Sequence, residues 1–297
     1  MISQDKFIES GGLDNRSITS LDFNEVVNKF NKEGCLIFRN FSIDPKSLTN
    51  LTDIYSHSYA ADTLRRDSRL GDKQIKNVDS GNNLIKLHSE ASFTTTWPEI
   101  LWFFCKTPPS KGYGGATTIC DSIDVWNNLS KETKAFFFKN PIVYNLKIPV
   151  LKNSKEGKGK KIWNINHVGA SDGYIDWSEG ALFFKFTRYA VHESKFQNKF
   201  CFSNHLFVDL DCEPQILSRT LLDGSNIPND IYNEINEIAD KYTHPFEWQE
   251  GDLMMIDNKR YLHGREGFKE GDVRDILSIQ TQKASFPYDA SWRKSRT

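Results

Sequence analysis

The stretch "IKLHSEA" at positions 85–91 places a histidine and a glutamate two residues apart among apolar residues. Successive side chains of a strand point to opposite faces, so Ile85 and Leu87 would face one way. His88 and Glu90 would then face the other way. An imidazole and a carboxylate that point together into a half-buried space cost free energy unless another group compensates them. We therefore expect a β-strand here whose polar face binds a metal ion.

A second histidine stands in a suggestive context near the end of the chain. His263 follows the apolar run "LMMI" within "DNKRYLHGREGF", where we expect the chain to turn at the mouth of a barrel. If His88, Glu90 and His263 converge, they form the facial triad of non-haem Fe(II) oxygenases, which leaves three positions open for a chelating cosubstrate and dioxygen. A lone H-x-E pair also occurs by chance, and zinc accepts the same ligands.

Arg274 lies eleven residues after His263, in "DVRDILSIQ", and would point into the barrel with Ser278. Its charge cannot be removed by deprotonation, so a buried Arg274 must find an anion. A dicarboxylate such as 2-oxoglutarate supplies one: its keto acid end would chelate iron and its distal carboxylate would meet the guanidinium. Thr117 in "GGATTICD" could add a hydroxyl donor. The alternatives are a salt bridge from Arg274 to a neighbouring aspartate and an ordinary strand threonine at 117.

Composition excludes several classes of partner. The 38 basic and 39 acidic residues give a net charge of −1, which favours neither nucleic acid nor an anionic membrane. The five cysteines include no CxxC pair, so no disulfide framework or zinc knuckle is indicated. No apolar run approaches the roughly 18 residues of a membrane span, and the N-terminus does not look like a signal peptide. We therefore expect a cytoplasmic protein.

The pattern of elements predicts a mixed α+β protein that is mainly β. Strands are expected at 35–41, 84–91 and 100–105 and again in the last third. Helices are expected after a Ser20 cap, with Gly34 as the stop, and over 228–242. This arrangement indicates a jelly roll with outer helices in a single domain, 1–297, whose core is about 34–285. The lysine-rich segment 152–161 is expected to be a solvated loop or a lid.

Several segments together resemble the taurine dioxygenase (TauD/TfdA) family of Fe(II)/2-oxoglutarate-dependent oxygenases, and most of all its clavaminate-synthase-like branch. The matching stretches, in the order of the family, are "GCLIFRNF", "LHSEASF", "WPEILWFFCKTPPSKGYGGATTICDS", "FCFSNHLF", "WQEGDLMMIDNKRYLHGREGF" and the arginine of "VRDIL". They extend from residue 34 to residue 275.

The resemblance implies a double-stranded β-helix with iron at its mouth. It implies His88, Glu90 and His263 as catalytic metal ligands. It also implies Thr117 and Arg274 as the residues that hold 2-oxoglutarate. The carboxylate ligand is a glutamate, as in the clavaminate-like branch. Taurine-type enzymes carry a second arginine where this chain has Ser278, which disfavours taurine as substrate.

The expected reaction is oxidation of a C–H bond in a small metabolite, by hydroxylation or by oxidative ring closure or desaturation. The candidate substrate contacts are Arg65, Arg66, Asn204 and Ser278, and the arginines favour an anionic, amino-acid-derived substrate. His205, beside Asn204, is expected to be structural. No nucleic acid or membrane partner is expected, and a homo-oligomer is left open. The rival hypotheses are a non-catalytic jelly-roll binding protein and a zinc hydrolase.

Overall fold

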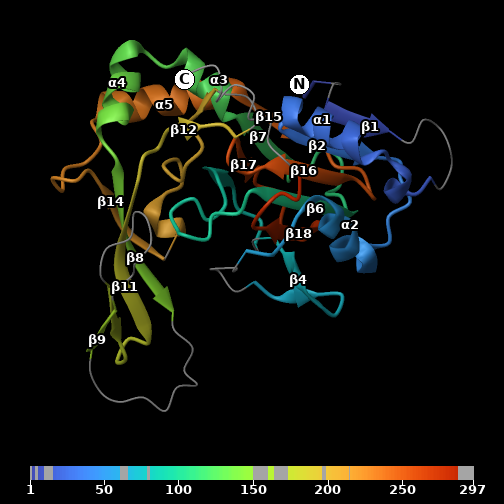
Figure 1. The fold of residues 1–297 in the computed structure, drawn as a ribbon, viewed down its shortest axis with the longest axis horizontal. Coiled ribbons are helices and arrows are strands. Elements are labelled where there is room, and N and C mark those ends of the chain that lie inside the picture. Colours follow the sequence, from blue (N-terminus) through green and yellow to red (C-terminus); the bar gives the residue numbers. More distant parts are fainter. Residues whose placement is uncertain are drawn as a thin grey trace.

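The structure is a computed structural model of the 297-residue chain. It describes residues 2–3, 6–9, 16–60, 66–78, 81–149, 160–163, 173–195, 199–213 and 215–286. Within these residues the chain is mainly β, with helices on the outside (Figure 1). The predicted fold class is confirmed.

Two sheets form the jelly roll. The larger has seven strands, in the order β1 (Phe7–Glu9), β2 (Cys35–Arg39), β16 (Leu253–Asp257), β6 (Ile100–Thr107), β18 (Asp275–Thr281), β4 (Asp72–Asn77) and β3 (Ser68–Arg69). The smaller has four, in the order β15 (Thr243–Phe246), β7 (Thr117–Asp121), β17 (Tyr261–Arg265) and β5 (Ile85–His88). Buried side chains from both sheets share one cluster, in which Leu101 and Met254 of the larger sheet join Ile119 of the smaller. The two sheets therefore pack face to face.

A second set of strands forms an arm beside the jelly roll (Figure 1). Its five-stranded sheet has the order β14 (Ile216–Thr220), β8 (Ile142–Pro149), β11 (Ala181–Arg188), β10 (Gly173–Asp176) and β9 (Lys160–Trp163), and β12 (His192–Glu193) pairs with β13 (Phe200–Cys201). The segment predicted as a loop or lid, 152–161, lies outside the described residues except for its last two positions, which begin β9.

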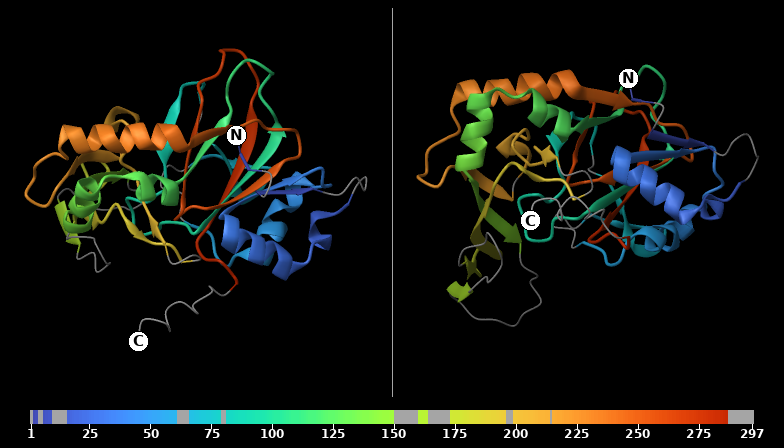
Figure 2. Two further views of the ribbon diagram at one scale, coloured as in Figure 1. Left: turned by 90° about the horizontal axis from the view of Figure 1, so that it is seen from above. Right: turned by 45° about the horizontal axis from the view of Figure 1, so that its top comes forward.

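Helices flank the strands on opposite sides (Figure 2). They are α1 (Phe23–Glu33), α2 (Leu48–Tyr55), α3 (Ser122–Asn128), α4 (Lys131–Lys139) and α5 (Asn229–Tyr242), with 3-10 turns at Ile18–Ser20, Pro45–Ser47 and Leu210–Cys212. Phe30 of α1 and Leu51 of α2 pack on the larger sheet, and Ile235 of α5 packs in the cluster that joins the arm to the smaller sheet. The helix predicted over 228–242 is confirmed. No helix among the described residues is long and apolar enough to cross a membrane.

The start of α1 corrects one prediction. Ser20 ends the preceding 3-10 turn, and the cap is Asp22, whose carboxylate accepts a hydrogen bond from the backbone N–H of Glu25 at 2.9 Å. Both residue types cap helices, so sequence alone did not separate two candidates this close together. Gly34 ends the helix as predicted, with φ 70°, and a Cβ there would lie 2.8 Å from Arg260.

A partly buried histidine outside the jelly roll, His192, makes stability depend on pH. His192 Nε2 donates a hydrogen bond to the carbonyl of Lys259 at 2.6 Å, and burial lowers the pKa of His192 to about 4. Between pH about 6.5 and 4 the unfolded chain therefore binds more protons at this position, so its contribution to stability falls as the pH falls. His192→Gln should remove about 2 kcal/mol of the stability lost between pH 7 and 4.5.

The measurement is the free energy of unfolding in urea at several pH values for both proteins. Burial raises the pKa of Asp257 to about 6, which gives the opposite slope, but that contribution is common to both proteins. Equal slopes for the wild type and His192→Gln would contradict the prediction.

Candidate metal centre

His88 and His263 are brought together by the pairing of two neighbouring strands. β5 and β17 run antiparallel, and His88 lies directly opposite His263 in their register. Side chains at directly opposed positions share a face of the sheet. The two ring centroids are 4.3 Å apart. The strand register therefore brings together two histidines that lie far apart in the sequence.

Glu90 reaches the same place from a turn, which corrects the predicted strand 84–91. β5 ends at His88, and Ala91 has φ 54°. The turn is held by Asn258, whose side-chain oxygen accepts from the Glu90 N–H at 2.9 Å. The Asn258 amide in turn donates to the carbonyls of Glu90 and Pro98, each at 3.0 Å. Sequence reasoning missed Asn258, because nothing local to "IKLHSEA" indicates a clamp from β16 and its following turn.

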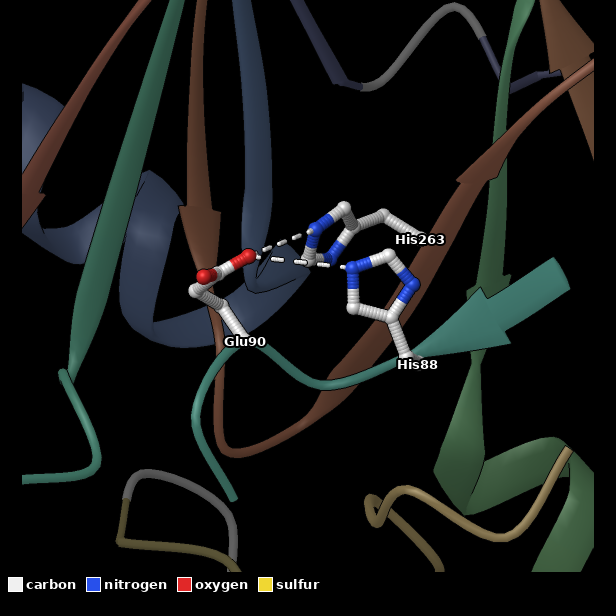
Figure 3. Close-up of side chains that lie close together, drawn as sticks. All are labelled: His88, Glu90 and His263. Atoms are coloured by element: carbon white, nitrogen blue, oxygen red, sulfur yellow. Dashed lines mark ion pairs between the residues drawn. The ribbon is translucent and has the colours of Figure 1, made fainter. Parts of the chain in front are cut away.

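The three side chains point toward one another (Figure 3). Glu90 Oε2 lies 3.7 Å from His88 Nε2 and 4.0 Å from His263 Nε2. One ligand atom from each residue lies within 4.8 Å of the others, and all three residues are buried. A set of two imidazole nitrogens and one carboxylate oxygen at this spacing can surround a single divalent ion.

The protonation states of His88, Glu90 and His263 bear on whether they can bind a metal ion. His88 Nδ1 lies 2.9 Å from the carbonyl of Lys86, which can only accept a hydrogen bond, so Nδ1 carries a proton and Nε2 is the nitrogen available to a metal. Burial, followed by the nearby His88, lowers the pKa of His263 well below its usual value, so this imidazole is neutral at pH 7. Burial alone would raise the pKa of Glu90, but Arg66 and then His88 outweigh it and the pKa ends well below its usual range. The neutral imidazole of His263, the ionised carboxylate of Glu90 and Nε2 of His88 therefore face one another, and the residues fit a metal.

The triad lies in a cavity between the two sheets. Its other lining residues are Arg66, Val78, Ile85, Leu101, Phe103, Thr117, Gly264, Arg265, Arg274, Ser278 and Gln280. The predicted pair Arg274 and Thr117 meets there across the jelly roll, because Arg274 directly precedes β18 and Thr117 begins β7. Arg274 Nη2 donates to Thr117 Oγ1 at 3.0 Å, and Arg274 Nε donates to the Gly115 carbonyl at 2.8 Å.

The neighbouring aspartates do not neutralise Arg274. Asp275 pairs with Arg69 at 2.9 Å, and Asp272 accepts hydrogen bonds from Ser110. Among the described residues no carboxylate lies within ion-pair distance of Arg274. Burial, with Arg265 adding to it, lowers the pKa of Arg274 to about 10, so the guanidinium stays charged at pH 7. A partly buried guanidinium with no carboxylate partner among the described residues favours an anionic ligand.

Thr117 is oriented to donate a hydrogen bond. Its hydroxyl oxygen accepts from Arg274 and also from Trp248 Nε1, at 2.8 Å. Both lone pairs of the oxygen are then used, which leaves the hydroxyl proton for a further acceptor. Arg274 and Thr117 thus present donors to the same region of the cavity.

The candidate substrate contacts fall into different places. Arg65 lies outside the described residues. Arg66 and Ser278 line the cavity, but Asn204 does not. The Asn204 amide is used by the backbone, donating to the Phe202 carbonyl at 3.0 Å and accepting from the Leu206 N–H at 3.0 Å.

His205 is buried beside the triad but is held by a different partner. Its Nε2 lies 3.4 Å from Glu213, and its ring centroid lies 5.3 Å from that of His88. It is not among the group that could hold a metal in the described residues. Gln280, which sequence reasoning did not assign, does line the cavity.

Comparison with known proteins gives a consistent family. The family model described as "Taurine catabolism dioxygenase TauD, TfdA family" matches residues 3–280. The chain is 25% identical over 204 residues to 3-((Z)-2-isocyanoethenyl)-1H-indole synthase of Fischerella ambigua, a match that covers 67% of this chain and 63% of that protein. It is 24% identical over 264 residues to a clavaminate synthase-like protein of Arabidopsis thaliana, covering 80% of this chain and 78% of that protein.

Solved structures share the fold. PvcB of Pseudomonas aeruginosa superposes with a TM-score of 0.61 at 15% identity, covering 93% of this chain and 84% of PvcB. A second PvcB structure is described as an Fe, alpha-ketoglutarate dependent oxygenase from an isonitrile synthetic pathway. AAD-2, solved with Mn(II) and N-oxalylglycine, gives a TM-score of 0.61 at 17% identity and covers 97% of both chains.

Proposed function

The chain belongs to the TauD, TfdA family of dioxygenases, and we propose that it is an Fe(II)- and 2-oxoglutarate-dependent oxygenase. His88, Glu90 and His263 are the proposed iron ligands. The observation that carries the proposal is that this donor set and the Arg274–Thr117 pair line one cavity. A zinc hydrolase with the same triad would leave the charge of Arg274 without a role, and a binding protein without iron chemistry would not need the complete set of triad, Arg274 and Thr117.

The proposed cosubstrate fits the charges at the two ends of the cavity. A dicarboxylate that chelates a metal on the triad would present its other carboxylate to Arg274, with Thr117 as a further donor. Charge-assisted hydrogen bonds from a guanidinium to a carboxylate are short and strong. The two residues would thereby fix the orientation of 2-oxoglutarate before oxygen binds.

Iron would supply the activation of dioxygen and the oxidising power. The protein supplies placement and exclusion of water. Apolar side chains from both sheets, among them Ile85, Leu101 and Phe103, form part of the wall. A carbon–hydrogen bond held near the metal against these apolar side chains would be protected from competing reactions with water.

We propose a small anionic, amino-acid-derived substrate in specialised metabolism. Arg66 is paired with Glu90, so with Fe(II) and 2-oxoglutarate bound the positive charges of the metal and Arg274 would exceed the negative charge of the dicarboxylate. That excess of positive charge favours an anion. The names of the relatives support the setting, since one makes an isocyanoethenyl indole and PvcB is described as part of an isonitrile pathway.

The function is tested by substrate-triggered turnover. Purified protein with Fe(II), 2-oxoglutarate and air would be screened against amino acids, their N-acyl and isocyano derivatives and matched amines without the carboxylate. The expected result is succinate release and a mass change in the product for a carboxylate only. Product masses separate hydroxylation from ring closure or desaturation. Turnover of the amine in preference to the acid would contradict an anionic substrate.

Gln280 is predicted to contact the substrate. It pairs with Leu101 at the end of β18 that lies near the Glu90 turn, whereas Arg274 lies at the other end. Six residues of a strand separate them by roughly 20 Å. The Gln280 amide is buried, lines the cavity and has no hydrogen-bond partner among the described residues. An amide in that position needs a polar group of a ligand or a water molecule.

Gln280→Leu should therefore raise the KM for the substrate about 10-fold, because one hydrogen bond of about 1 to 1.5 kcal/mol is lost. The KM for 2-oxoglutarate should not change. The matched control is Gln282→Leu, since Gln282 lies just beyond β18 and donates to the Trp97 carbonyl at 3.2 Å outside the cavity. The assay is steady-state succinate release. Equal effects of the two substitutions would place Gln280 away from the substrate.

A further inference from the structure

The two oxygens of the Glu90 carboxylate face different partners. Oε2 faces the two imidazoles, at 3.7 Å from His88 and 4.0 Å from His263. Oε1 faces away from them and accepts from both terminal nitrogens of Arg66, at 3.1 Å from Nη1 and 3.2 Å from Nη2. A weaker contact of 3.4 Å joins Nη2 to Oε2. One oxygen thus points to the metal position and the other to a guanidinium.

Arg66 is well placed to hold this arrangement. Its side chain is 10% exposed and that of Glu90 is 11% exposed, so the ion pair is shielded from water. The Arg66 carbonyl accepts a hydrogen bond from Lys76 Nζ of β4 at 3.3 Å, which ties the segment before β3 to the larger sheet. The charge-assisted bonds on Oε1 are therefore made by a residue whose own backbone is anchored.

The hydrogen bonds from Arg66 affect how many oxygens of Glu90 can bind a metal ion. A glutamate can bind a metal through one oxygen or chelate it through both. Chelation by Glu90 would turn Oε1 toward the metal and break two hydrogen bonds to a buried arginine. A chelating glutamate would also occupy one of the positions that a facial triad keeps open.

We propose that Arg66 is a positioning residue that keeps Glu90 bound to the metal through one oxygen only. It would thereby keep free one of the positions that a facial triad leaves open on its metal. The inference rests on the proposed function for the identity of the metal. It differs from the role expected from the sequence, in which Arg66 binds an anionic substrate, because Glu90 already compensates the guanidinium.

The test measures coordination and not turnover alone. The proteins are the wild type, Arg66→Leu, Arg66→Lys and, as a matched control, Arg39→Leu. Arg39 makes a bidentate ion pair with the buried Asp252, at 2.9 and 2.6 Å, away from the cavity. Each is loaded anaerobically with Fe(II) and 2-oxoglutarate and titrated with nitric oxide, which occupies the open position and gives an electron paramagnetic resonance signal. Co(II) affinity and the visible spectrum of the Co(II) protein are measured in parallel.

Arg66→Leu is expected to weaken nitric oxide binding by at least 10-fold, to change the Co(II) spectrum and to alter Co(II) affinity by about 10- to 100-fold, the usual range for an outer partner of a ligand. Arg66→Lys should recover part of each effect, and Arg39→Leu should resemble the wild type. Nitric oxide binding and a Co(II) spectrum unchanged in both Arg66 variants would overturn the inference, and a raised substrate KM in that case would assign Arg66 to the substrate.

Failure of the proposed function gives a different result. Wild-type protein would then bind no 2-oxoglutarate on the metal, and no variant comparison would be needed to see it. A Leu variant that does not fold leaves Arg66→Lys, which keeps the charge but cannot make the two-nitrogen contact with Oε1. Wild-type coordination in a folded Lys variant would also count against the inference.

Discussion

Replacing Glu90 by glutamine is expected to lower Fe(II) affinity by more than about 100-fold and to abolish 2-oxoglutarate turnover. Loss of an outer partner of a metal ligand already costs about 10- to 100-fold in affinity, and this change removes a charged ligand itself. Glutamine has nearly the same size as glutamate, so the Asn258 clamp on the backbone of the turn is retained. Equilibrium dialysis with Fe(II) under anaerobic conditions and a succinate assay in air measure the two effects.

Glu213→Gln is the matched control. Glu213 is also a glutamate beside a buried histidine, with 3.4 Å between its carboxylate and His205, but it does not belong to the triad. Its substitution should leave Fe(II) affinity within a few-fold of the wild type. Wild-type Fe(II) affinity in Glu90→Gln would show that the metal, if any, binds elsewhere.

Arg274→Leu is expected to raise the 2-oxoglutarate concentration needed for half-maximal turnover by about 100- to 4,000-fold. Loss of one partner of a buried charge pair costs about 3 to 5 kcal/mol, and each 1.4 kcal/mol is a factor of ten. Thr117→Val removes a single hydroxyl donor and should cost about 10-fold. Succinate release at varied 2-oxoglutarate concentration measures both effects.

Metal binding provides the internal control for these variants. Fe(II) affinity without 2-oxoglutarate should stay near the wild-type value in both, because neither residue belongs to the triad. Half-saturation by 2-oxoglutarate at the wild-type concentration in Arg274→Leu would mean that another cation binds the cosubstrate. Arg265, which also lines the cavity, would then be the residue to test.

The histidine pair illustrates what local pattern can predict. Alternation in "IKLHSEA" correctly turned His88 toward the interior. His263 was expected where the chain turns after "LMMI", but the turn comes earlier and His263 lies in the middle of β17 (Tyr261–Arg265). The extension of the strand to Glu90 was wrong. The turn that carries Glu90 is held by Asn258, which is far away in the sequence, and hydrogen bonds between distant segments leave no periodic signal.

The residues proposed to contact the substrate were harder to predict from the sequence than the metal ligands. Arg66 was selected for its charge and does line the cavity, but its partner Glu90 became visible only in three dimensions. Asn204 was selected by position and is used by the local backbone. Gln280 shares a strand face with Arg274, yet that pattern does not tell that the Gln280 side chain makes no hydrogen bond to the described residues.

The central claim is that His88, Glu90 and His263 hold an iron ion that 2-oxoglutarate chelates. Its most direct test is anaerobic addition of Fe(II) and then 2-oxoglutarate to the wild-type protein, followed by visible absorption. We predict a charge-transfer band that requires both additions, saturates at one equivalent of Fe(II) and is absent in Glu90→Gln. A protein that binds the metal at this triad but shows no band with 2-oxoglutarate, or one that binds no metal there, would contradict the claim.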